Sequence, residues 1–269
     1  MNVKRPGGRH APRAYLLASI AAGAIVLIAV LVTRGAESRP ACRSALIPAY
    51  VPPGEIADLV GRSDRSRVLI VNPSSGPGAQ PHPAYQEAVS RAKEAGTRVL
   101  GYVPTSYGAR ALRSAMDDVD RYNSWYEIDG IFVDEAAHSD ERLSYYQALS
   151  SHIRASGDEL IVLNPGVVPA RGYFDAGDVV VTFEGSYSDY SAALEQMPDW
   201  VRQMPRSRIA HLVYAASADE ATRVVESATG AGYLYVTSGS LPNPWGALPR
   251  YLDQEEALLE SCRVRNPKR

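Results

Sequence analysis

Eight short apolar segments, rich in β-branched residues, recur along the chain at fairly even spacing. Between most of them lie longer stretches with the polar and apolar spacing of amphipathic helices, several of which end on glycine. Nearly continuous apolar strands that alternate with helices predict a parallel sheet buried on both faces. The eight segments are SALIPAYV (44–51), SRVLIVNP (66–73), TRVLGYVP (97–104), DGIFVDE (129–135), ELIVLNPG (159–166), DVVVTFEG (178–185), RIAHLVYA (208–215) and AGYLYVTS (231–238).

Eight such units in about 220 residues match an α/β fold, the (β/α)8 barrel of the TIM type. An open doubly wound sheet is the alternative, but it is expected to carry a G-x-G-x-x-G turn after its first strand. The turn here reads AYVPPGE and lacks that motif. We therefore predict a barrel over residues 44–262, with helices that include residues 83–96, 109–126, 141–157, 190–204 and 217–232.

The region before the barrel has the pattern of a membrane anchor. Residues 14–33 carry no charge and are long enough to cross a bilayer as a helix. Four basic residues in the segment 1–13 precede this stretch, and only one follows it closely, so the positive-inside rule places the barrel outside the cytoplasm. We expect an uncleaved transmembrane signal-anchor, followed by a linker over 34–43. A cleaved signal peptide, which would make the protein secreted, is the alternative.

The chain has two cysteines, and they stand at opposite ends of the predicted barrel domain. Cys42 precedes the first strand, and Cys262 lies just before the basic tail 263–269. The first strand and the last helix of a barrel are neighbours, and an exported domain folds in an oxidising compartment. We expect a Cys42–Cys262 disulfide, with two unrelated free thiols as the alternative.

Charge is distributed unevenly along the chain. Residues 40–262 contain 18 basic and 29 acidic residues, a formal net charge of −11. Such an acidic domain argues against nucleic acid as a partner. Solubility and the attraction of a cationic ligand are both consistent with this charge.

Polar and aromatic residues follow the apolar segments, at the strand ends where barrel enzymes build their active sites. Two of them are acids: Asp134 shares a strand face with Phe132, and Glu184 shares one with Thr182, so that both can point into the barrel mouth. The fourth and sixth strands contribute to one interior layer, which places their backbones roughly 9 Å apart. The residues that leave the strands are Tyr50, Asn72, Tyr102, Asp134, Glu135, Asn164, Glu184, Tyr214 and Thr237.

Two carboxylates at the barrel mouth are the groups that glycosidic cleavage needs. One protonates the leaving oxygen, and the other attacks or stabilises the oxocarbenium-like centre, at separations of about 5 to 9 Å. Like charges in a partly desolvated mouth raise the pKa of one of them toward neutrality. The alternative is that both acids cap the helices that follow them.

Three motifs in order, "IDGIFVDEA" on the fourth strand, "LNPG" on the fifth and "VVTFEGSY" on the sixth, resemble the spherulin-4-like family, glycoside hydrolase family 135. The resemblance covers about residues 44–258. It implies a cell-surface or secreted (β/α)8 hydrolase acting on α-1,4-linked N-acetylgalactosamine in microbial exopolysaccharide. The functional acids that it implies are Asp134, Glu135 and Glu184.

We assign Asp134 as nucleophile or stabiliser and Glu184 as general acid/base, with Glu135 orienting the substrate or tuning its neighbour. An adjacent Asp-Glu pair also occurs where the substrate's own acetamido group attacks, and in that case Glu135 would be the acid. The sequence leaves both arrangements open. It also leaves open a second function, that of a non-catalytic glycan-binding or wall-associated surface protein that kept the barrel.

Sugar binding needs flat apolar surfaces and hydrogen-bonding groups, and the strand ends and loops offer both. Any one aromatic residue can instead be packing, and the two asparagines, each of which precedes a proline, can instead form turns. The candidate substrate-binding residues are Tyr50, Asn72, Tyr102, Tyr107, Asn164, Tyr187, Tyr214 and Trp245.

Other chemistries find little support in the sequence. Glu135 and His138 form one E-x-x-H, but a di-iron site needs a second copy, and neither H-E-x-x-H nor a cysteine cluster suggests zinc. No G-x-S-x-G elbow is present. Lys93, the only lysine between residues 40 and 262, falls on an expected helix, which argues against a Schiff-base aldolase. We expect no metal and no cofactor.

Overall fold

The computed structural model describes residues 43–61, 67–157, 160–227 and 230–264. The predicted anchor over 14–33 lies outside the described residues, as do Cys42 and the side chain of Cys262. The anchor and the disulfide therefore stay predictions. Within the described part of the chain, no helix has both the length and the apolar character needed to cross a membrane.

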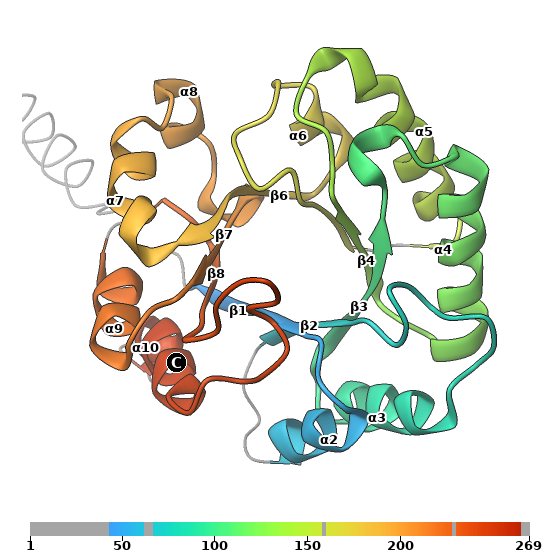
Figure 1. Ribbon diagram of the computed structural model, residues 1–269, viewed down its shortest axis with the longest axis horizontal. Helices are drawn as coiled ribbons and strands as arrows, with labels where there is room; N and C mark the ends of the chain where they lie inside the picture. The colour runs from blue at the N-terminus through green and yellow to red at the C-terminus, as the bar shows by residue number, and fades with distance from the viewer. Residues whose placement is uncertain (1–42, 62–66, 158–159, 228–229, 265–269) are drawn as a thin grey trace, which may run out of the picture. The chain divides into compact units, whose positions relative to one another are not determined.

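The eight strands form a closed barrel in which each strand runs parallel to its neighbours in the order β1 to β8. Figure 1 looks into this ring. Each strand falls within or next to one of the eight predicted segments, so the predicted barrel is confirmed and the open sheet is wrong. The strands are β1 Ser44–Ala49, β2 Arg67–Val71, β3 Arg98–Pro104, β4 Gly130–Asp134, β5 Leu160–Leu163, β6 Val179–Ser186, β7 Ile209–Tyr214 and β8 Tyr233–Val236.

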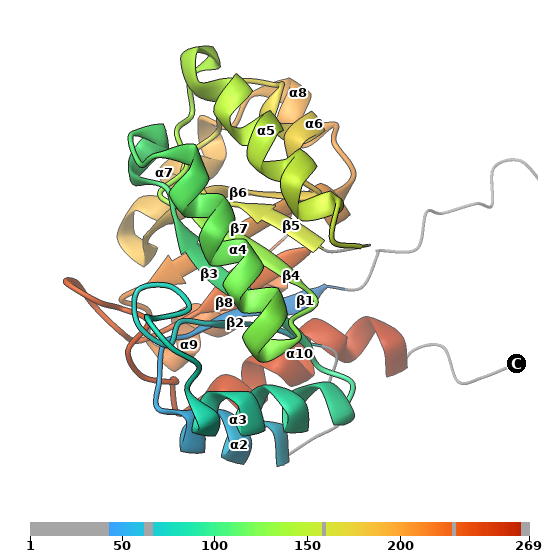
Figure 2. The same ribbon diagram turned by 90° about the vertical axis from the view of Figure 1, so that its right-hand side faces the viewer.

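The helices surround the ring of strands (Figure 1), and the loops that follow β2 and β8 project at the end where the strand arrows point (Figure 2). This end carries the candidate site. The helices are α2 Pro53–Gly61, α3 Pro83–Glu94, α4 Leu112–Tyr126, α5 Leu143–Arg154, α6 Tyr173–Ala176, α7 Tyr187–Glu195, α8 Asp199–Arg202, α9 Ala218–Glu226 and α10 Leu252–Val264, with 3-10 turns η1 Ser106–Gly108, η2 Asp140–Arg142 and η3 Arg206–Arg208.

The strands are buried on both faces because side chains fill the barrel on one side and helices cover the other. All five residues of β2 are buried, as its uninterrupted apolar sequence predicts. In β3, Gly101 allows Tyr122 of α4 to pack directly on the strand, since a Cβ at this position would lie 2.6 Å from the Tyr122 ring. The hydroxyl of Tyr122 then donates to the carbonyl of Val71 in β2.

The single helix predicted over 190–204 is wrong, because the chain forms two helices there. Helix α7 ends at Glu195, and α8 begins after Pro198. Proline lacks the N–H that continues a helix and disfavours helical geometry in the residue before it. The helix predicted over 217–232 is a single helix, α9. It begins at a capping box, in which Ser217 and Glu220 each bond the other's backbone N–H.

Strand β6 breaks the simple alternation used to orient Glu184. Its register with β7 shifts between Val181 and Phe183. The hydroxyl of Thr182 bonds His211, whose other ring nitrogen bonds Tyr190 of α7 outside the barrel. Thr182 therefore does not share the mouth-facing side with Glu184, and the prediction that it does is wrong. The extra residue of a β-bulge re-aims the side chains that follow it.

Helix α10 carries two buried acids against the strands where the barrel closes. Glu256 forms an ion pair with Arg67 of β2 at 2.8 Å, and Glu255 accepts a hydrogen bond from the backbone N–H of Val236 in β8 at 2.8 Å. Burial, with the nearby Glu256 carboxylate as a second cause, raises the pKa of Glu255 well above its usual value. The folded protein therefore keeps the Glu255 proton to higher pH than the unfolded chain does.

We expect Glu255 to make the fold less stable as pH rises. Above the unfolded-state pKa of about 4.3, the unfolded chain has released a proton that the folded state still holds, so the free energy of unfolding falls by up to about 1.4 kcal/mol per pH unit. Glu255→Gln removes this titration. The free energy of unfolding, measured with denaturant between pH 5 and pH 7, should therefore fall less steeply with pH in Glu255→Gln than in wild type, by up to about 1.4 kcal/mol per pH unit. The same substitution at the exposed Glu226 is the matched control, and identical slopes in wild type and Glu255→Gln would contradict the assignment.

Candidate active site

Two carboxylates and one amide meet at the barrel mouth, each from a different strand. Asp134 ends β4, Asn164 follows β5, and Glu184 lies near the end of β6. The Asn164 Nδ2 donates to Asp134 Oδ1 at 2.7 Å and to Glu184 Oε2 at 2.5 Å. The two predicted acids therefore converge, as the order of their strands indicates.

The LNPG motif explains the orientation of this amide. Gly166, whose φ is +69°, turns its backbone N–H back onto Asn164 Oδ1 at 3.1 Å. That bond fixes which end of the amide is the acceptor, so the NH2 group faces the two carboxylates. The carbonyl of Gly166 also accepts the backbone N–H of Glu184 at 2.9 Å, which ties the turn to β6.

The shared nitrogen also limits the separation of the two acids. The two carboxylate oxygens that it contacts cannot be farther apart than the sum of the 2.7 and 2.5 Å bonds. Retaining glycosidases hold their carboxyl groups about 5 to 5.5 Å apart, and inverting enzymes hold them about 6.5 to 9.5 Å apart. The contacted oxygens of Asp134 and Glu184 are therefore closer together than the carboxyl groups of an inverting pair.

Asp134 is surrounded by donors that favour its ionised form. Besides Asn164, its carboxylate accepts hydrogen bonds from the Tyr102 hydroxyl and from the backbone N–H of Glu135. Burial nevertheless raises the pKa of Asp134 above its usual value, and these three hydrogen bonds oppose the rise. Burial, followed by the charge of Asp134, also raises the pKa of Tyr102, which keeps this donor protonated.

Glu184 has fewer donors and a larger shift. Burial, with the Asp134 charge as a second cause, raises the pKa of Glu184 to about 7, against the opposing hydrogen bonds from Asn164 and the Trp245 side chain. Glu184 therefore keeps its proton to higher pH than an ordinary carboxyl group does, whereas three hydrogen bonds oppose the rise at Asp134.

Glu135 has a different environment from the other two acids. Its φ is +49°, in the left-handed region that few residues other than glycine adopt. Its Oε2 accepts the backbone N–H of Ser106 at 3.1 Å, and its carbonyl accepts that of Tyr107 at 2.6 Å. The Glu135 carboxylate is thus bonded to the loop after β3, whereas the Asp134 and Glu184 carboxylates share Asn164.

Four of the predicted aromatic residues gather around the acids. The Tyr50 and Tyr102 rings meet edge to face at 5.3 Å, and the Asp134 and Glu184 charges both act on the Tyr50 hydroxyl. Trp245, beyond β8, bonds Glu184, and its ring lies 6.2 Å from that of Tyr214.

Of three other predicted binding residues, one bonds within its own loop, one contacts a neighbouring helix, and one is exposed. Asn72 Oδ1 accepts the Gly76 N–H at 2.8 Å, so this asparagine forms a turn. The hydroxyl of Tyr187 contacts Arg223 at 3.3 Å. Tyr107 is 64% exposed on the loop after β3.

Two hydroxyls beneath the site were not predicted from the sequence. The buried Thr105 hydroxyl lies 2.9 Å from the carbonyl of Asp134 and 2.8 Å from that of Glu135, and 3.1 Å from the Tyr146 hydroxyl. Tyr146, on α5, accepts the Ala137 N–H at 2.7 Å. Thr105 directly follows β3, so the rule of polar residues at strand ends would have found it. Tyr146 lies within a helix and gives no such signal.

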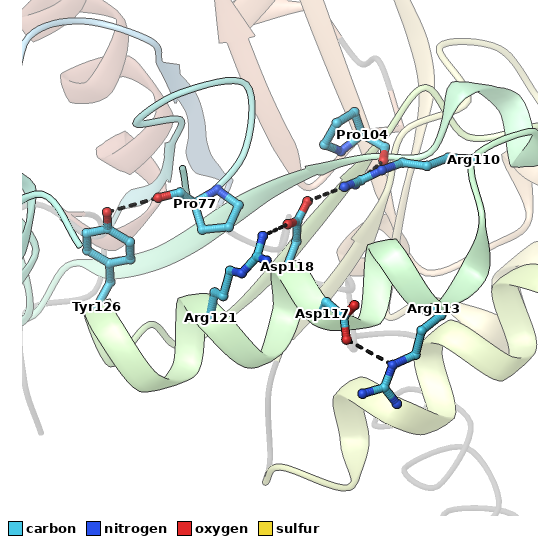
Figure 3. A network of polar contacts seen from close by, with 8 residues as sticks. All are labelled: Pro77, Pro104, Arg110, Arg113, Asp117, Asp118, Arg121 and Tyr126. Atoms are coloured by element: carbon cyan, nitrogen blue, oxygen red, sulfur yellow. Dashed lines mark hydrogen bonds and ion pairs between the residues drawn. The ribbon is translucent and has the colours of Figure 1, made fainter. Parts of the chain in front are cut away.

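Helix α4 holds the loop after β3 from the other side, as Figure 3 shows. Arg110 donates to the carbonyl of Pro104 at 3.0 Å and pairs with Asp118 at 2.6 Å. Arg121 pairs with the same Asp118 at 3.2 Å. Tyr126 at the end of α4 bonds the carbonyl of Pro77, in the loop after β2. One helix thereby fixes two neighbouring loops of the barrel mouth.

Among the described residues, no group of three or more His, Cys, Asp or Glu side chains is arranged to hold a metal ion.

Solved structures share this barrel. The crystal structure of Aspergillus clavatus Sph3 in complex with GalNAc matches with a TM-score of 0.72 and 20% identity, over 82% of this chain and 98% of that one. The chitinase RmChi1 from Rhizomucor miehei matches with a TM-score of 0.50 and 12% identity, over 80% of this chain and 99% of that one. At these identities the similarity shows a common fold.

Sequence comparison is more specific. Spherulin-4 from Physarum polycephalum is 33% identical over 234 residues, which cover 80% of this chain and 70% of that protein. Residues 45–258 match the model of spherulation-specific family 4. The resemblance carried by the three strand motifs is confirmed, and the chain belongs to the spherulin-4 family.

Proposed function

We propose that the protein is a glycoside hydrolase that cleaves an amino-sugar polymer of the α-1,4-linked N-acetylgalactosamine type. The observation that carries the proposal is the Asp134–Asn164–Glu184 arrangement, in which one amide holds two carboxylates of unequal proton affinity. The fold that the chain shares with Sph3 and with a chitinase supports it. The choice of sugar is supported by the N-acetylgalactosamine bound to Sph3 and by the family resemblance.

The two carboxylates take complementary parts in the proposed reaction. Glu184, whose pKa is raised to about 7, donates its proton to the leaving glycosidic oxygen. Asp134, held by three donors, attacks or stabilises the positive charge that develops on the sugar. Their short separation favours the retaining course, with Glu184 returning as a base to activate water. Because Glu135 bonds a neighbouring loop, the substrate-assisted route with Glu135 as acid has less support.

The proposed location is outside the cytoplasm. The uncharged segment over 14–33 and the basic residues before it support a tethered enzyme, and cleavage of that segment would release it. Either form gives the barrel access to extracellular polysaccharide.

The proposal is tested by reducing-end release from α-1,4-linked N-acetylgalactosamine polymer by the purified full-length protein. Wild type should release new ends, and Glu184→Gln should lower kcat by about 10² to 10⁴, because it keeps the shape but removes the proton donor. Wild type that binds the polymer as tightly as Glu184→Gln and releases nothing would instead indicate a non-catalytic glycan-binding protein.

The raised pKa of Glu184 predicts the pH dependence. The acid must be protonated, so kcat should fall about tenfold per pH unit well above about pH 7. A pH–rate profile of wild type on the same polymer measures this limb. Activity that rises through pH 7 and stays high at pH 9 would show that Glu184 is not the acid.

Asn164→Ala should move that limb. The Asn164 hydrogen bond favours the ionised Glu184, so its removal raises the pKa of Glu184 and shifts the alkaline limb to higher pH. The loss of positioning should also lower kcat by about tenfold or more. Asn72→Ala is the matched control, since Asn72 bonds only within its own turn in the contacts that the structure gives it. A lower kcat with an unmoved limb would mean that Asn164 positions the acids without tuning Glu184.

A further inference from the structure

Exposed apolar side chains gather at the end of the barrel that carries the two acids. Three large apolar residues are exposed in the described part of the chain: Tyr107 at 64%, Val167 at 48% and Leu241 at 68%. They follow β3, β5 and β8 respectively, so all three lie on loops of the barrel mouth. Tyr107 is the one that offers an aromatic face, the surface on which sugar rings stack.

The backbone that presents Tyr107 is strained. Ser106 and Tyr107 have φ of +48° and +55°, two consecutive left-handed residues that are not glycine. Each such residue costs about 1 to 3 kcal/mol and persists only where its surroundings enforce it. Burial does not repay this cost at Tyr107, because its side chain is mostly in water.

Glu135 supplies the contacts that enforce this conformation. Its carbonyl accepts the N–H of Tyr107 at 2.6 Å, and its carboxylate accepts the N–H of Ser106 at 3.1 Å. Glu135 is itself left-handed, with φ of +49°. On the other side, Arg110 bonds the carbonyl of Pro104, where the loop begins. These bonds hold the loop in this conformation in the absence of a ligand.

The same loop begins at a residue that bonds the backbone of the proposed nucleophile. The N–H of Thr105 donates to the carbonyl of Asp134 at 3.0 Å. Tyr107 is two residues farther along, so its Cα lies within about 7.6 Å of the Thr105 Cα. This places Tyr107 on a loop within reach of a sugar chain that extends from the two carboxylates.

We propose that Tyr107 is a stacking platform for a sugar unit next to the cleaved bond, and that Glu135 is the positioning residue that holds this platform. This inference rests on the proposed function and deepens it. It gives the enzyme a subsite for a longer amino-sugar chain. It also gives the second acid of the Asp-Glu pair a structural task in place of proton transfer.

Binding tests the platform without turnover. The full-length Glu184→Gln protein is titrated with α-1,4-linked N-acetylgalactosamine oligomers of increasing length. Tyr107→Ala added to this background should raise Kd at least fivefold for the longer oligomers and less for the dimer, because only longer chains reach the platform. Tyr107→Phe should bind like its parent, since it keeps the ring. Leu241→Ala, which removes exposed aliphatic surface from another mouth loop, is the matched control.

Two substitutions test Glu135. Glu135→Ala removes the bond to the Ser106 N–H but keeps the carbonyl bond to Tyr107, so it should weaken binding of long oligomers by no more than Tyr107→Ala does. The double variant should be no weaker than Tyr107→Ala alone, because both changes act on one platform. In turnover, Glu135→Gln keeps an acceptor for the Ser106 N–H, so its kcat should fall less than tenfold, whereas Glu184→Gln loses about 10² or more. A loss in Glu135→Gln equal to that in Glu184→Gln would make Glu135 the proton donor and overturn its positioning role.

The outcomes separate the two proposals. A wild-type protein that cleaves the polymer, together with a Tyr107→Ala variant whose Kd rises equally for all lengths or not at all, overturns the platform alone. A wild-type protein that neither binds nor cleaves these oligomers overturns the proposed function and the platform with it.

Discussion

The site depends on one amide that donates to two carboxylates. Asn164 can reach both because Asp134, Asn164 and Glu184 leave three consecutive strands, and the register of those strands sets their heights. Val133 pairs with Leu163, which in turn pairs with Val180. A slip of one residue in either pairing would turn one group out of the mouth. The register of the barrel strands therefore sets the positions of the two acids. Their unequal proton affinities follow from those positions.

Much of this arrangement could be predicted from the sequence, because it follows from local patterns. Apolar runs locate the strands, and the residue after each run locates the mouth, which placed Asp134, Asn164, Glu184 and Tyr102 correctly. The bulge in β6 could not be predicted, since it arises from pairing with β7 and leaves no trace in the alternation of Thr182 and Glu184.

The hydrogen-bond donors to the two acids could not be predicted from the sequence either. Which donors serve Asp134 and which serve Glu184 depends on loops that are distant along the chain, such as the one that carries Trp245. Asn72 shows the opposite failure: it leaves a strand like Asn164, yet its own turn uses its side chain. A strand-end residue is thus a candidate whose role the neighbouring loops decide, as they do for Glu135.

Helix α10 bears on how the molecule assembles. Glu255 of this helix bonds β8, and Glu256 pairs with Arg67 of β2. Arg67 and Glu256 are 189 positions apart in sequence. Contacts at such separation form late, because the chain must close a very long loop to make them. During synthesis β8 and α10 emerge last, so β1 lacks its second partner strand until β8 is available. Until then the unpaired edge of β1 can pair with another chain.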